Sequence, residues 1–184
     1  MARPMREDFL GSMRFQVSAT LAGGGPDPLQ PAGAQAGFSA CTMPELSQEG
    51  VEYREGNYIY TKKFPGVPSI GGDLTLSRGV SRRDTAFYNW MLTVVEGGPP
   101  GTQVAGEYRA DLEIKHYHRD VAVAPGSDLI PVKATPTKTV NILHAFPSRF
   151  KPGADFEATS GDVSIMELDV AFEQFKIVEA PPAP

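Results

Sequence analysis

Apolar and polar residues alternate with a period of two along much of the chain, which predicts β-strands with one buried face. The clearest run lies near the end, with apolar Met166, Leu168, Val170 and Phe172 on one side and Glu167, Asp169 and Glu173 on the other. Shorter runs cover residues 13–19, 38–43, 74–77, 111–116 and 140–146. In the last of these, Val140, Ile142, His144 and Phe146 are expected to share one apolar face.

Two further runs predict a β-hairpin. Residues 51–54 and 58–64 flank Glu55-Gly56-Asn57, a polar group that suits a tight turn. Pro65-Gly66 follows directly, and we expect it to turn the chain back to the body of the protein.

One segment departs from the period of two. Apolar residues recur at helical spacing and predict an amphipathic helix over about residues 82–95. Ser81 and Asp84 resemble a capping box, and Gly97-Gly98-Pro99-Pro100 ends the helix. The face expected to pack on the β-scaffold, or between protomers, consists of Phe87, Trp90, Met91 and Val94.

These elements predict a mainly β protein, an antiparallel β-barrel or sandwich with one helix. The 184 residues suit one domain, expected at 1–178. Segments rich in Gly, Pro and small residues, about 97–106 and 120–138, are expected to be surface insertions. The proline-rich end, 179–184, is expected to be a disordered tail.

The charge and cysteine content exclude several kinds of protein. A net charge of -5 argues against a dedicated nucleic-acid binder, which needs many phosphate-neutralising residues. A single cysteine, Cys41, excludes an internal disulfide and suits buried packing. No run resembles a signal peptide or a bilayer-spanning segment, so we expect assembly in the cytoplasm and no membrane anchor.

Candidate chemistry is sparse. His116 and His118 would project from one face of a strand, but a metal site needs a third ligand and His144 is the other histidine. The glutamates of 45–55 have no nucleophile or base beside them. We therefore expect neither catalysis nor a cofactor. Two alternatives stay open: a metal-dependent enzyme using the histidine pair, and a monomeric β-barrel that carries a small ligand.

An ordered set of motifs resembles the inner tail-tube proteins of contractile phage tails and phage-tail-like injection systems. The resemblance covers roughly residues 6–178. The matching motifs are, in order, Gly37-Phe38-Ser39, Glu52-Tyr53-Arg54-Glu55-Gly56-Asn57, Pro65-Gly66, Leu76-Ser77-Arg78-Gly79-Val80 and Trp90. The two insertions and the proline-rich end depart from the family pattern.

The resemblance implies a barrel-like protomer that forms hexameric rings, stacked as a hollow tube inside a contractile sheath. Its implied partners are further copies of itself, the sheath protein, a baseplate or spike adaptor, a terminal cap, and luminal cargo or a tape-measure protein. The particle would be cytoplasmic, membrane-attached, released from the cell, or a virion. A phage tail tube conducting DNA and a baseplate-proximal paralogue are the near alternatives.

Two groups of residues are candidates for contacts in such a tube. We expect the hairpin to reach the next ring, with acidic and basic arms matching along the axis. Its candidate contact residues are Glu52, Tyr53, Arg54, Glu55, Asn57, Tyr58, Tyr60, Lys62 and Lys63. Candidates for a polar lumen wall are Asp111, Glu113, Lys115, Glu167, Asp169 and Glu173.

Overall fold

The computed structural model describes residues 11–31, 37–56, 59–97, 108–118, 135–154 and 161–179. This part of the chain is mainly β with one helix, which confirms the predicted fold class. The elements are β1 (Phe15–Leu21), β2 (Ala40–Cys41), β3 (Glu45–Tyr53), β4 (Lys62–Gly71), β5 (Leu74–Gly79), α1 (Ala86–Val95), β6 (Ala110–His116), β7 (Lys138–Lys151), β8 (Ile165–Ala171) and β9 (Gln174–Glu179).

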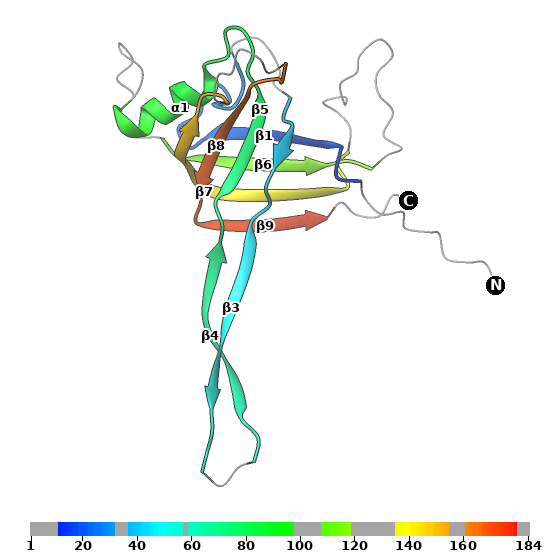
Figure 1. Cartoon of the computed structure of the whole chain (residues 1–184), viewed down its shortest axis with the longest axis vertical. Coiled ribbons are helices and arrows are strands. Elements are labelled where there is room, and N and C mark those ends of the chain that lie inside the picture. Colours follow the sequence, from blue (N-terminus) through cyan, green and yellow to red (C-terminus); the bar gives the residue numbers. More distant parts are fainter. Residues whose placement is uncertain are drawn as a thin grey trace, which may run out of the picture.

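The main strands form two antiparallel layers that share β7. Strands β1, β6, β7 and β9 lie side by side in that order, and we call them sheet A. The second half of β7 pairs instead with β8, followed by β5 and β2, and we call these strands sheet B. Figure 1 shows the strands of the two layers crossing one another, with α1 at one end. The core lies between them.

A bulge at His144 lets β7 pass from one sheet to the other. His144 has a left-handed backbone with φ of 56°, which is uncommon for a residue with a side chain. The pairing of β6 with β7 shifts at this point, and the backbone N–H of His144 donates to Asp111 Oδ1 at 2.9 Å. Bulges of this kind bend a strand and increase its twist.

The same bulge overturns the predicted face of residues 140–146. Val140 and Ile142 are buried as expected, but His144 is exposed. Ala145 and Pro147 are buried beyond it, because the extra residue moves the alternation by one position.

Apolar side chains from both sheets and the helix fill the core. The runs in β5, β6 and β8 have the buried positions that their alternation predicted. The main members are Val17, Leu29, Leu74, Leu76, Phe87, Trp90, Leu112, Ile114, Val140, Ile142, Met166, Leu168 and Val170.

The helix begins four residues later than predicted. It covers Ala86–Val95, and Ser81 and Asp84 lie before it and do not form a capping box at its first turn. The backbone at Arg83 is left-handed, with φ of 69°, and a left-handed residue cannot continue a right-handed helix. On the packing face, Phe87 and Trp90 are buried and Met91 is half-buried, but Val94 is exposed.

The closing alternation contains two strands, not one. The chain reverses at Phe172 and Glu173, so that β9 returns along β7, and the N–H of Glu173 donates to the carbonyl of Leu143 at 3.3 Å. Glu179 ends β9 and therefore does not begin a tail. Likewise, Lys138 starts β7 rather than ending an insertion. Residues 98–107, 119–134 and 180–184, where most of the predicted insertions and tail fall, lie outside the described residues.

Candidate functional site

Strands β3 and β4 form a long hairpin that projects from the body (Figure 1). Within the described residues they pair with each other and with no other strand. The predicted hairpin is therefore confirmed, but it is longer toward the body than residues 51–64, since its strands start at Glu45 and end at Gly71. At the outer end β4 begins only at Lys62, and Asn57 and Tyr58 lie outside the described residues.

Pro65-Gly66 does not turn the chain back to the body, as the sequence had suggested, but continues β4. Pro65 pairs with Gly50, and the register shifts between Gln48 and Gly50. A side chain at Gly66 would bring its Cβ within 2.8 Å of the carbonyl oxygen of Glu49, so the close approach of the strands requires glycine here. Pro65 is tolerated because both strands of a two-stranded hairpin are edge strands, where a residue without a backbone N–H need not break the pairing.

Two ion pairs form within the hairpin. Lys63 Nζ lies 3.1 Å from Glu52, its direct cross-strand neighbour, and Lys62 Nζ lies 3.3 Å from Glu55. Both pairs are solvent-exposed, and such pairs contribute about 0–1 kcal/mol each. Both lysines thus have an acidic neighbour within the same copy.

The apolar residues of the hairpin are left without cover in the described part of the chain. Val51 and Phe64 face each other across the strands and are half exposed, as is Tyr53. Near the tip, Ile59 and Tyr60 are 84% and 75% exposed. A two-stranded hairpin is at best marginally stable in water, so these side chains indicate a surface that meets a partner. Val51, Ile59 and Phe64 were not among the predicted contact residues, although their apolar character in a largely polar hairpin was a usable signal.

The outward face of sheet A is polar and joins three of the predicted lumen residues. Asp111, Glu113 and Lys115 alternate with buried positions on β6, and Lys115 Nζ lies 2.8 Å from Glu113. The strand registers continue this face in rows. One row is Gln16, Lys115, Thr139 and Val178, and the next is Ser18, Glu113, Asn141 and Lys176.

The other three predicted lumen residues lie elsewhere. Glu167 and Asp169 are on β8, on the outward face of sheet B, and Glu173 is in the turn before β9 and pairs with Arg109. Asp169 accepts hydrogen bonds from Arg149 and Thr75. The outward faces of two packed sheets point in opposite directions, so Glu167 and Asp169 do not share a face with Asp111, Glu113 and Lys115.

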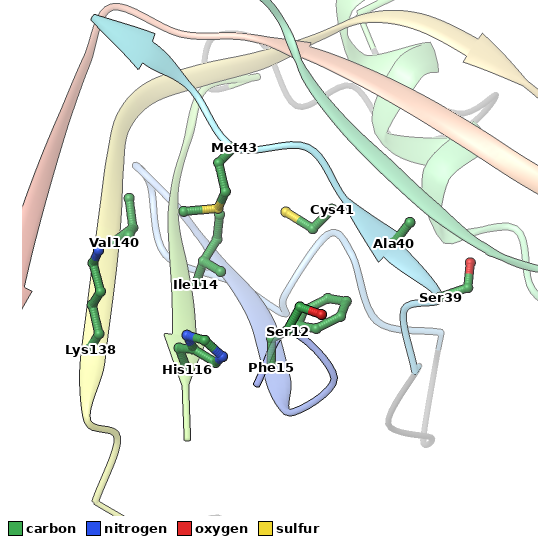
Figure 2. Close-up of a pocket in the computed structure, with 10 residues that line it drawn as sticks. All are labelled: Ser12, Phe15, Ser39, Ala40, Cys41, Met43, Ile114, His116, Lys138 and Val140. Carbon is green, nitrogen blue, oxygen red and sulfur yellow. The ribbon is translucent and has the colours of Figure 1, made fainter. Parts of the chain in front are cut away.

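A cleft of about 470 Å³ opens between the inner side of sheet A and the edge strand β2. Figure 2 shows Cys41 and Met43 on one side of it, facing Phe15 and Ile114 on the other. Burial raises the pKa of the Cys41 thiol to about 12, so this thiol is protonated and unreactive at neutral pH. No sequence pattern predicted this cleft, because it is formed by strands that are distant in the chain.

The histidine pair lacks the surroundings of a metal centre. His116 lies at the cleft, where its Nε2 is 2.7 Å from the carbonyl oxygen of Gly11. In the described ranges, no group of three or more His, Cys, Asp or Glu side chains could hold a metal ion.

No helix among the described residues is long and apolar enough to span a membrane.

In the described part of the chain, the open sheet edges and the exposed apolar side chains of the projecting hairpin are surfaces at which other chains can join. The model of the T4-like virus tail tube protein gp19 family matches residues 11–176. The chain belongs to this family, which confirms the resemblance carried by its sequence motifs.

Solved structures show the same fold over nearly the whole chain. A chain in the anti-feeding prophage (AFP) baseplate structure has a TM-score of 0.67 at 17% identity, covering 97% of this chain and 98% of that one. A chain in the sheath–tube complex of the extracellular contractile injection system PVC, in its extended state, has a TM-score of 0.65 at 19% identity, covering 95% of each. No curated protein sequence matches significantly.

Proposed function

We propose that this member of the tail tube family is the structural subunit of the hollow inner tube of a contractile injection system. Hexameric rings would stack inside a contractile sheath, and sheath shortening would drive the tube through a target envelope. The observation that supports this most directly is the combination of two open edges on sheet A with a hairpin that leaves the body. The edges suit joining within a ring, and the hairpin suits joining between rings.

Ring closure follows from the edges. In sheet A, β1 and β9 are the outermost strands among the described residues, and each presents unpaired backbone groups. Pairing of β9 in one copy with β1 in the next is a head-to-tail contact, which forms a ring when the rotation closes. A closed ring of sheets has no remaining edge.

The outward face of sheet A would then line the lumen. This assigns Asp111, Glu113 and Lys115 to the wall, and it leaves Glu167 and Asp169 on the far side of the protomer. Apart from Val178 the facing rows are polar, and the pair of Glu113 with Lys115 balances opposite charges. Such a wall does not hold passing cargo by burial of apolar surface.

The wider partners of the tube are also part of the proposal. The solved relatives come from structures titled as a baseplate, a terminating cap and a sheath–tube complex. By analogy, this chain would meet a sheath protein, a baseplate or spike adaptor, a cap, and luminal cargo or a tape-measure protein. Its role would be to form the wall of the tube, without catalysis.

A second candidate is the tail tube of a contractile-tailed phage, which conducts DNA. The matching family model is described for T4-like viruses, which favours it. The nature of the neighbouring genes separates the two: capsid and terminase genes indicate a phage, and their absence beside sheath and baseplate genes indicates an injection system. The neighbouring genes also show whether a second tube paralogue is present.

Negative-stain electron microscopy of the purified protein tests the assembly. Rings or tubes are expected. Featureless monomers at high concentration would contradict the proposal and favour a monomeric carrier, to which the cleft beside β2 offers a binding space.

A further inference from the structure

We propose that the cleft beside β2 receives the hairpin tip of a copy in the neighbouring ring. This inference rests on the proposed function, because it requires stacked rings, and it adds the surface that receives the hairpin. The occupant is a second copy of this chain, inserting Ile59 and Tyr60.

The position of the cleft supports this occupant. Met43 lines the cleft, and β3 begins two residues later at Glu45, so the cleft lies at the base of the protein's own hairpin (Figures 1 and 2). The hairpin leads away from the body. Its tip therefore cannot reach the cleft of the same copy.

The reach of the hairpin matches one repeat of a stack. From Met43 to Gly56 there are thirteen steps along the chain, and at about 3.3 Å per residue these span about 40 Å. A compact body of roughly 150 residues is about 38 Å across. If copies repeat along the hairpin direction at the body's width, each tip arrives at the base of the next hairpin, where the next cleft opens.

The surfaces are also chemically complementary. The tip presents one aromatic and one branched aliphatic side chain that are largely exposed. Most residues that line the cleft are apolar, and aromatic anchors in desolvated pockets supply much of the energy of protein interfaces.

Photo-crosslinking of assembled tubes tests the inference. A benzophenone amino acid replaces Tyr60 at the tip and, as a matched control, Val67, which is 79% exposed on β4 of the same hairpin. Irradiated Tyr60 tubes are expected to give a ladder of covalent multimers, because every copy has one tip and one cleft. Mass spectrometry should join position 60 to peptides that contain Cys41, Met43 or Ile114. Crosslinks from position 67 should map elsewhere.

A variant that fills the cleft gives a second test. Ala40 lines the cleft but is exposed, so Ala40→Trp should keep the fold, with an unchanged melting temperature, while rings no longer stack. Tubes that form normally while position 60 crosslinks to other surfaces, or that tolerate Ala40→Trp, would overturn the inference and leave the proposed function standing. Absence of rings and tubes from the wild-type protein would overturn both.

Discussion

Arg78 and Asp84 form an ion pair inside the protein. Nη2 of Arg78 lies 2.7 Å from Oδ1 of Asp84, and the two side chains are 2% and 3% exposed. Nη1 of Arg78 also donates to the carbonyl of Leu29 at 2.5 Å, and the guanidinium lies 3.8 Å from the centre of the Phe87 ring. This arginine, part of the Leu76–Val80 motif, thus joins β5, the loop after β1 and the start of α1.

Removing the partner of Arg78 should destabilise the fold strongly. Burial lowers the pKa of Arg78, and the nearby charge of Asp84 opposes that effect. Asp84→Ala removes the ion-pair partner of the buried guanidinium and leaves it only the weaker charge effect of Asp27, so we expect a loss of about 3–5 kcal/mol in the free energy of unfolding. Urea denaturation measures it, with exposed Arg82→Ala as the control. Equal effects of the two changes would show that the pair does not stabilise the fold.

Trp90 should be the most sensitive position of α1. Its side chain is 2% exposed, and Nε1 donates to the carbonyl of Tyr108 at 2.9 Å. Trp90→Ala creates a cavity and leaves that carbonyl unpaired, so we expect a loss of about 3–5 kcal/mol. Thermal melts should show a large drop, whereas Val95→Ala, on the exposed side of the same helix, should change little. An unchanged midpoint for Trp90→Ala would contradict its place in the core.

The sequence was sufficient to predict strands and their buried faces where local alternation and tertiary packing agree. The apolar side of β8 and the hairpin both follow from the residues themselves. It was insufficient where one residue changes the register: nothing in the run 140–146 marks His144 as a left-handed bulge, and Phe172-Glu173 lacks the usual glycine or asparagine of a turn. Contacts between distant strands, including the cleft at Cys41, could not be read from spacing at all.

Asp169 should make stability depend on pH in the acidic range. Burial alone would raise its pKa, but hydrogen bonds from Arg149 and Thr75 outweigh burial and hold the pKa below the usual 3.8. A lowered folded-state pKa stabilises the protein above the unfolded value and loses that effect as the pH falls through the folded value. Wild type should therefore exceed Asp169→Asn in stability at pH 7, and the difference should shrink below about pH 4. Urea melts at several pH values would show it; a difference that does not vary with pH would contradict this account.

The assignment of sheet A to the lumen predicts a pattern of chemical protection. In a Cys41→Ala background, Ser18→Cys places a thiol on the polar face of sheet A, and Ser77→Cys places one on the outward face of sheet B. In assembled tubes, a maleimide attached to a large polymer should label position 77 and not position 18, while a small maleimide labels both. The opposite protection pattern would assign the lumen to sheet B.

The hairpin charges should act within each copy rather than between rings. Because Glu52 pairs with Lys63 across the strands, removing both charges with Glu52→Gln and Lys63→Gln should cost little, and tubes should form as in wild type. Lys62→Glu with Lys63→Glu instead gathers four carboxylates at the outer end of the hairpin, together with Glu52 and Glu55. The fold should persist, but repulsion should weaken stacking, most of all at low salt, where charges are least screened.

Sedimentation and electron microscopy at low and high ionic strength measure this difference in tube length. If the neutral pair variant loses tubes as readily as the charge reversal, the glutamates and lysines bridge neighbouring rings directly. If instead the reversal forms tubes of wild-type length at low salt, the charges do not influence stacking. The apolar tip would then hold the rings together without their help, since Ile59 and Tyr60 lie beyond both ion pairs.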